Sequence, residues 1–170
     1  MEPSDDRRGG EERLFLGVEM PEDARGRLAA HLRGALGSRA LPGRAVAPAS
    51  WHLTLRFLGG TPPTRRAALA GALRGADLGG GFTVAFGGLG ALAAAAEEAA
   101  RRAGFPAEDR PFSAHLTLSR IRPAVDVRPL LERVPAFHER IRVDDVVLFR
   151  SHLGAGGARY EAVERFPLRP

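Results

Sequence analysis

Residues 51–59 read WHLTLRFLG and residues 114–121 read AHLTLSRI, so the chain carries nearly the same segment twice, and the two histidines, His52 and His115, are 63 positions apart. Each segment alternates polar and apolar residues with a period of two, which predicts a β-strand with one buried face. A turn with proline and then a helical stretch follow each copy, at residues 64–78 and 126–134. We interpret this pattern as an internal duplication.

The repeated histidines and threonines form a chemically coherent set. Side chains two residues apart in a strand share a face, so His52 and Thr54 point one way, as do His115 and Thr117. Two such strands facing each other would place two imidazoles and two hydroxyls around one cleft. An imidazole with a pKa of about 6.5 accepts or donates a proton near neutral pH, and a hydroxyl donates a hydrogen bond to a phosphate oxygen. The pattern therefore predicts acid/base chemistry on a phosphate.

The composition is that of one globular domain: 170 residues, 44% hydrophobic and 26% charged. Cysteine is absent, which excludes thiolate nucleophiles, cysteine-based zinc sites, iron–sulfur clusters and disulfides, and agrees with a reducing cytoplasm. We see no signal peptide and no apolar run of membrane-spanning length. We expect residues 1–12 to form a disordered tail, residues 13–170 one bilobal domain, and the protein to be a cytoplasmic monomer without membrane contact.

All 25 basic residues are arginine, and the net charge is +5. Arginine is the better fork for phosphate. A chain this rich in alanine, glycine, arginine and proline is also what a GC-rich genome encodes, so the charge permits an anionic partner such as RNA without demonstrating one.

The remaining elements favour an α+β fold. We expect a helix from Pro21 to Leu36, ended by Gly37, and a second helix over residues 93–102. Strands are expected at residues 13–19, 82–86, 140–153 and 158–166. These strands are short and alternating, which favours half-exposed antiparallel sheets over a doubly wound parallel one.

Several other candidates compete with these motifs. Residues 88–93 match a relaxed dinucleotide fingerprint, but the chain lacks repeated βαβ units. A zinc site on His52 and His115 lacks a third ligand at a recognisable spacing. We expect the other histidines to be surface or core-edge residues, with His152 beside Ser151 as the one that could border the cleft; they are His31, His138 and His152.

Two arginines are candidates for holding the phosphate. Arg56 has the same strand parity as His52 and Thr54, whereas strict alternation puts Arg120 on the face opposite the second histidine unless a bulge rotates it. Trp51 and Phe57 have the parity of the core, and we expect them to be packing residues rather than platforms for base stacking.

The two His-Leu-Thr-Leu motifs resemble the signature of the 2H phosphoesterase superfamily, in particular the RNA 2′,3′-cyclic phosphodiesterase (2′,5′ RNA ligase-like) family. The similarity extends to residues 13–15, 44–59, 110–120 and 151, and to Gly157-Ala158-Arg159-Tyr160-Glu161. The resemblance implies a duplicated two-lobe fold in which each lobe is an antiparallel sheet with outer helices, and the lobes enclose a central cleft. One departure is visible: family members carry a further strand between the strand near Val84 and the helix near Ala93.

By the same resemblance, His52 is the proton donor, His115 is the proton acceptor, and Arg120 contacts the phosphate. We therefore expect hydrolysis of RNA or nucleotide 2′,3′-cyclic phosphates to 2′-phosphomonoesters, with Thr54 and Thr117 holding phosphate oxygens, no metal and no cofactor. The reverse reaction would be 2′,5′ RNA ligation. The alternatives are a non-catalytic module that binds RNA ends or nucleotides, and a cyclic phosphodiesterase for a small nucleotide metabolite.

Overall fold

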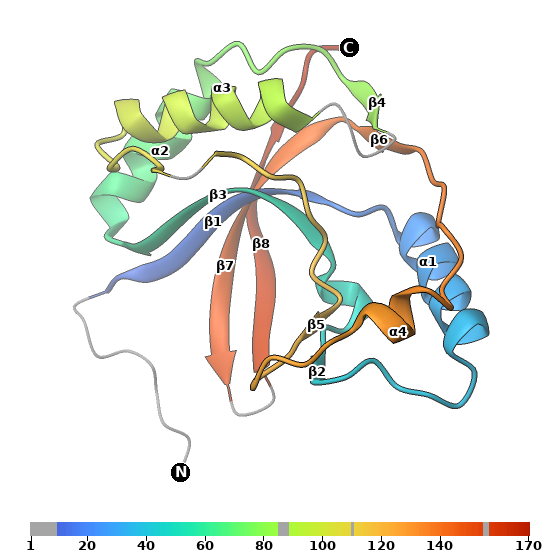
Figure 1. The fold of residues 1–170 in the computed structure, drawn as a ribbon. Coiled ribbons are helices and arrows are strands. Elements are labelled where there is room, and N and C mark those ends of the chain that lie inside the picture. Colours follow the sequence, from blue (N-terminus) through green and yellow to red (C-terminus); the bar gives the residue numbers. More distant parts are fainter. Residues whose placement is uncertain (1–9, 85–88, 110, 155–156) are drawn as a thin grey trace.

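The computed structural model describes residues 10–84, 89–109, 111–154 and 157–170. Its centre is a four-stranded antiparallel sheet with the strand order β3-β1-β7-β8 (Figure 1). The strands are β1 (Glu12–Glu19), β3 (His52–Thr61), β7 (Asp145–Gly154) and β8 (Gly157–Pro167). Because β1 pairs with both β3 and β7, the first strand of the chain joins the first motif to the C-terminal hairpin.

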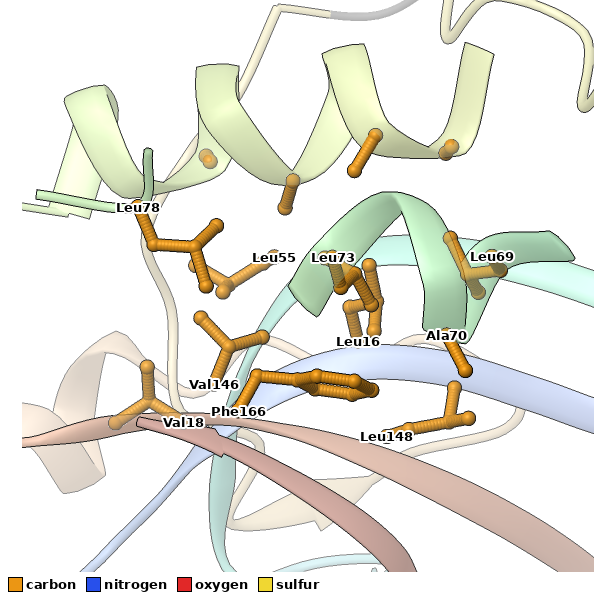
Figure 2. Packing of buried hydrophobic residues seen from close by; sticks show 14 of the residues in the cluster. Leu16, Val18, Leu55, Leu69, Ala70, Leu73, Leu78, Val146, Leu148 and Phe166 are labelled. Atoms are coloured by element: carbon orange, nitrogen blue, oxygen red, sulfur yellow. The ribbon is translucent and has the colours of Figure 1, made fainter. Parts of the chain in front are cut away.

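Helices α2 (Pro63–Arg74) and α3 (Leu89–Arg102) cover one face of this sheet (Figure 1). The main hydrophobic core lies between these two helices and the sheet. Figure 2 shows Leu16, Leu73 and Phe166 packed together within this core. The face of α3 that enters this core is made of small side chains, namely Ala93, Ala96, Ala99 and Ala100. Small side chains allow a helix to approach its neighbours closely, so α3 packs against both α2 and β3.

The other face of the sheet has a second, aromatic cluster. Alternate residues of β1 point to opposite faces, so Leu14 and Leu16 enter the main core while Phe15 points away from it. Phe15 packs with Val147 and Phe149 of β7 and with Tyr160 of β8. The ring of His52 lies against this cluster, and we call this side of the sheet the histidine face.

The other elements surround this sheet. α1 (Glu22–Leu36) follows Pro21, has two acids in its first turn, and ends at Gly37 with a positive φ of 59°, which agrees with the predicted helix. The antiparallel pairs are β2 with β5 and β4 with β6. The remaining bounds are β2 (Arg44–Ala45), η1 (Pro48–Ser50), β4 (Phe82–Val84), β5 (Ser119–Arg120), α4 (Arg128–Leu131) and β6 (Ile141–Val143). None of the described helices is both long and apolar enough to cross a bilayer.

The two copies of the repeat form unequal structures. The first motif lies in the ten-residue strand β3, but of the predicted strand at 114–121 the structure has only an isolated bridge at Leu116 and the two-residue strand β5. Both helices after the motifs are shorter than predicted: α2 ends before Gly75, and α4 is a single turn. The predicted tail falls largely on residues 1–9, and the segment in which family members carry a further strand includes residues 85–88; both stretches lie outside the described residues.

Candidate active site

A single antiparallel bridge joins the two motifs: Leu53 of β3 pairs with Leu116. In this antiparallel register, the residues that flank the bridge lie opposite one another: His52 is next to Thr117, and Thr54 is next to His115. Both leucines pack on the hydrophobic core, so the histidines and threonines, one position along, point away from it. The structure thus brings together the four residues that the repeat singled out.

The two imidazoles are held in the same way. Nδ1 of His52 lies 2.8 Å from the carbonyl oxygen of Ser50, and Nδ1 of His115 lies 2.9 Å from that of Ser113. A carbonyl oxygen only accepts hydrogen bonds, so in each ring Nδ1 carries the proton and donates it. Nε2 is then the nitrogen left for exchange with a substrate. The serine two residues before each histidine extends the repeat, a feature that the sequence analysis did not use.

His52 lies in an aromatic enclosure. Its ring centroid is 4.7 Å from Phe15, 4.7 Å from Tyr160 and 5.6 Å from Phe149. Burial among these rings lowers the pKa of His52 from its ordinary value, the hydrogen bond to the Ser50 carbonyl opposes that effect, and the positive charges of Arg120 and His115 lower the pKa further. His115, in contrast, is exposed. The two imidazoles therefore differ in environment although their motifs are alike.

Gly17 of β1 lies in the sheet beside His52 and Thr54. It pairs with Thr54, and a Cβ at this position would lie 2.9 Å from the carbonyl oxygen of Leu53 and 3.4 Å from the ring of Phe149. The rings of His52 and Phe149 converge over this part of the sheet. Sequence reasoning missed Gly17, because its role depends on Phe149, which is more than 130 residues away in the chain.

The predicted placement of Arg56 on the face of His52 and Thr54 is wrong. The partners of Gly17 and Leu16 in β3 are Thr54 and Arg56, so Leu55 has no partner in β1 and the strand bulges there. The bulge turns Arg56 into the protein on the α3 side, where it is 8% exposed and forms ion pairs with Glu97 and Glu108. Its guanidinium also donates hydrogen bonds to the carbonyl oxygens of Phe57 and Pro106.

The same bulge makes the packing prediction wrong for Phe57 and leaves it correct for Trp51. Trp51 precedes the bulge, is 4% exposed and donates its indole N–H to the carbonyl oxygen of Val46. Phe57 follows the bulge, pairs with Phe15 and is 55% exposed on the histidine face. Its ring centroid is 6.0 Å from that of Phe15.

Arg120 remains a candidate for holding an anion. It lies in β5 directly opposite Arg44 of β2, and neither arginine has an acidic partner among the described residues. Its positive charge contributes to the lowered pKa of His52, which keeps Arg120 a candidate for charge stabilisation near that imidazole. The guanidinium of Arg44 lies against Gly157, at the start of β8, which places β2 and β5 beside the end of the β7–β8 hairpin (Figure 1).

Two of the other histidines have hydrogen-bond partners outside the two motifs. His31 hydrogen-bonds to the carbonyl oxygen of Pro135 at 2.8 Å, and His152 pairs with Glu161 at 2.7 Å across the β7–β8 hairpin. Over residues 10–84, 89–109, 111–154 and 157–170, no three histidine or acidic side chains are grouped to hold a metal ion. Gly88, at the start of the dinucleotide-like stretch, lies outside the described residues, and the chain from Leu89 onward is α3.

The hydroxyls of the site are available to a ligand. Thr54, Thr117 and Tyr160 make no side-chain hydrogen bond to any part of the protein that the structure describes. The site therefore combines two imidazoles with Nε2 open for proton transfer, hydroxyl donors beside them, and the cationic side chain of Arg120. This is a set suited to acid/base chemistry on an anionic phosphorus centre.

The family model of the LigT-like phosphoesterases matches the chain twice, at residues 18–93 and 85–160. Each match contains one of the two histidine motifs. The chain belongs to the LigT-like phosphoesterase family. The double match agrees with the internal duplication, and with the α+β fold it places the protein in the 2H phosphoesterase superfamily.

Solved structures support this assignment over more than nine-tenths of the chain. The apo form of E. coli LigT has a TM-score of 0.77 and 26% identity, and covers 95% of this chain and 100% of its own. A crystal structure described as a phosphoesterase has a TM-score of 0.76 and 27% identity, with coverages of 94% and 99%. A protein of Thermus thermophilus named TT0787 has a TM-score of 0.70 and 28% identity, with coverages of 92% and 98%. No curated protein matches the sequence.

Proposed function

We propose that this phosphoesterase hydrolyses the 2′,3′-cyclic phosphate of RNA ends or nucleotides to a 2′-phosphomonoester. The observation that carries the proposal is the bridge between Leu53 and Leu116, which supports a diagonal arrangement of two identically anchored histidines on one face of the paired motifs. One imidazole can take a proton while the other gives one, as opening of a cyclic phosphodiester by water requires.

In the proposed reaction, Nε2 of His115 removes a proton from a water molecule as the water oxygen attacks phosphorus. The bond from phosphorus to the 3′-oxygen breaks, and His52 supplies its Nε2 proton to that oxygen. The products are a 3′-hydroxyl and a 2′-phosphomonoester. A second turnover requires the proton to pass from His115 back to His52, through solvent.

Charge explains how His52 can act as the acid although its pKa is lowered in the free protein. A bound phosphate places a negative charge beside the imidazole, which favours the protonated ring and opposes the effect of burial. Thr54 and Thr117 donate hydrogen bonds to the phosphate oxygens, and Arg120 adds a positive charge where negative charge develops in the transition state. No step in this scheme requires a metal or a cofactor.

Structures of E. coli LigT complexed with 3′-AMP, NADP+ and ATP, and with phosphate, support a nucleotide phosphate as the class of ligand. By microscopic reversibility, the same residues would join a cyclic phosphate to a 5′-hydroxyl as a 2′,5′ bond. We place this ligation second, because water is present at far higher concentration than any 5′-hydroxyl end.

The test is to identify the product. Purified protein is incubated with adenosine 2′,3′-cyclic phosphate and with an oligoribonucleotide that ends in a 2′,3′-cyclic phosphate, and the new ends are compared with 2′- and 3′-phosphate standards. We expect only 2′-phosphate. Formation of 3′-phosphate would overturn the assignment of the leaving oxygen, and tight binding without turnover would favour the non-catalytic module. Turnover of the nucleotide alone would favour a small metabolite as substrate.

A further inference from the structure

The two histidine motifs lie far apart in the chain, so their relative position depends on the contacts that join them. One such contact is the bridge between Leu53 and Leu116. Another is made by residues 42–46, which follow α1, contain β2 and precede η1. We call these residues the 42–46 segment. It belongs to the first half of the chain, but β2 pairs with β5 at the end of the second motif (Figure 1).

The 42–46 segment holds the second motif on both sides of this short strand pair. The backbone N–H of Val46 donates a hydrogen bond to the carbonyl oxygen of Leu118 at 2.9 Å. The hydroxyl of Ser119 donates a hydrogen bond to the carbonyl oxygen of Pro42 at 2.5 Å. The bridge fixes the second motif at one residue, Leu116, and the 42–46 segment fixes it again two and three residues further along. Together these contacts set the direction of the second motif as well as its place.

The same segment is tied to the first motif. The carbonyl oxygen of Val46 accepts a hydrogen bond from the indole N–H of Trp51 at 3.0 Å, and Trp51 directly precedes His52. Trp51 is buried, and both Val46 and Leu118 pack against the hydrophobic cluster that contains it. The backbone of Val46 therefore connects the residue before the first histidine with the strand end that follows the second histidine.

Gly43 allows the 42–46 segment to approach the second motif closely. Its φ of 78° lies in the region that favours glycine. A Cβ at this position would lie 2.5 Å from the carbonyl oxygen of Arg120 and 2.8 Å from the Cα of Ile121. Both are backbone atoms, so neither can rotate away as a side chain would. Any larger residue at position 43 would push the second motif away from the segment.

We propose that the 42–46 segment is a positioning element that holds His115 and Arg120 at their working distance from His52, with Gly43 as the residue that permits this distance. The inference rests on the proposed function, because it concerns how the acid and the base of that reaction are aligned. Groups that transfer protons act only from a narrow range of positions, and a misplacement of about 1 Å can cost about 100-fold in rate.

The pKa of His52 reports on this distance. Burial among aromatic rings of the central sheet lowers the pKa first, and the positive charges of Arg120 and His115 lower it further. The other ionisable groups beside His52 are the Tyr160 hydroxyl and Glu19 of β1, whose carboxylate is paired with two arginines. If the 42–46 segment is displaced, the charges of the second motif retreat while the aromatic rings stay. The pKa of His52 then rises toward its ordinary value.

The experiment compares Gly43→Ala with a matched control, Gly79→Ala. Gly79 also has a positive φ, of 83°, but a Cβ there meets nothing within 4 Å, so this variant has the backbone strain without the contact. With adenosine 2′,3′-cyclic phosphate, Gly43→Ala is expected to lower kcat by about 10- to 100-fold and to change KM by less than about threefold, because the alignment of acid and base is felt in the transition state. Gly79→Ala is expected to keep kcat within about twofold of wild type.

The second readout is an NMR titration of isotope-labelled histidines, in which the resonance of His52 is assigned by its loss in His52→Asn. We expect the pKa of His52 to rise in Gly43→Ala and to stay unchanged in Gly79→Ala. A variant that is merely less stable has a smaller folded fraction, but its folded molecules keep the pKa of the wild type. An unchanged titration of His52 in folded Gly43→Ala would therefore overturn the positioning role, whatever its kcat.

A milder pair of variants serves if Gly43→Ala does not fold. Ser119→Ala removes the hydrogen bond to the carbonyl of Pro42 without adding an atom, and Ser119→Thr keeps the hydroxyl. We expect Ser119→Ala to lower kcat by about 2- to 10-fold, the usual effect of one hydrogen bond, and to raise the pKa of His52. Ser119→Thr should restore both values. If the alanine and threonine variants behave alike, this contact does not position the second motif.

These outcomes separate the positioning role from the proposed function. A wild-type protein that hydrolyses no 2′,3′-cyclic phosphate would refute the proposed function, and the titration of His52 in the variants would still decide the role of the 42–46 segment. Full hydrolysis by Gly43→Ala with an unshifted titration of His52 would instead overturn the positioning role and leave the hydrolytic function standing.

Discussion

Replacement of Gly17 by alanine tests whether the site depends on close packing of β1 beneath His52 and Thr54. Gly17 has no positive φ, so its backbone accepts alanine, and glycine inside a strand ordinarily costs about 0.5–1 kcal/mol relative to alanine. Without close neighbours, Gly17→Ala would stabilise the protein. The structure predicts the opposite sign, because the new Cβ would lie 2.9 Å from the backbone oxygen of Leu53 and 3.4 Å from the ring of Phe149.

The size of the effect follows from what must move. The Leu53 carbonyl belongs to the paired strand β3 and cannot rotate away, so β1 and β3 must separate by a few tenths of an ångström. Overpacking of this kind costs about 1–3 kcal/mol, which for a domain of this length lowers Tm by roughly 2–4 °C per kcal/mol. A 1 Å misplacement of catalytic groups can cost about 100-fold in rate, so we expect this smaller shift to reduce kcat/KM on the order of 10-fold.

Urea unfolding gives the free energy of unfolding, and hydrolysis of adenosine 2′,3′-cyclic phosphate gives kcat/KM. The matched control is Gly26→Ala in α1, where a Cβ meets nothing within 4 Å. We expect it to stabilise the protein by about 0.5–1 kcal/mol and to leave kcat/KM unchanged. If Gly17→Ala proves as stable and as active as Gly26→Ala, the close approach of β1 and β3 does not limit the site.

The contacts of the site lead to four more predictions. His52→Ala and His115→Ala should each lower kcat by at least about 10²- to 10⁴-fold, and the double variant should be little worse than either. Thr54→Val or Thr117→Val should lower kcat by at most about 10²- to 10³-fold. A histidine variant whose kcat stays near that of the wild type in steady-state kinetics would refute the role of that histidine. Hydrolysis should survive dialysis against EDTA, and loss with rescue by zinc or manganese would contradict it. The pKa of His52 is lowered in the folded protein, so the unfolded chain binds a proton on this imidazole more readily. The contribution of His52 to the free energy of unfolding is therefore complete above about pH 6.5 and is lost as the pH falls through the lower pKa of the folded protein. Urea unfolding of His52→Asn should show a flatter pH dependence over this range than that of the wild type. Arg56→Met should destabilise the fold by about 1–3 kcal/mol in urea unfolding, because the partly buried carboxylates of Glu97 and Glu108 lose their ion pairs with the guanidinium. Unchanged stability would show that these ion pairs do not hold the bulge.

Local sequence was enough to predict the fold class and the four candidate residues. Strand periodicity is a property of the backbone, so the repeated His-x-Thr pattern alone placed each histidine on the face of its threonine. Helix boundaries at Pro21 and Gly37 likewise depend on residues adjacent in the chain. The duplication was visible because both copies retain the same spacing, and the family model confirms it by matching each copy.

Tertiary pairing decided the surroundings of these residues. Whether β3 bulges at Leu55 depends on its register with β1 and on the carboxylates of Glu97 and Glu108, none of which the motif contains. A one-residue slip exchanges the faces of all residues that follow, so Arg56 and Phe57 took the opposite sides from those predicted.

The environment of His52 has the same origin. Its lowered pKa comes first from burial against Phe15, Phe149 and Tyr160, which lie on three strands brought together only by the sheet. The sequence by itself therefore determined which groups can exchange protons, because that depends on side-chain type and strand period. Only the tertiary structure determined how strongly His52 holds its proton and what lies beside its ring, because desolvation and stacking depend on residues distant in the chain.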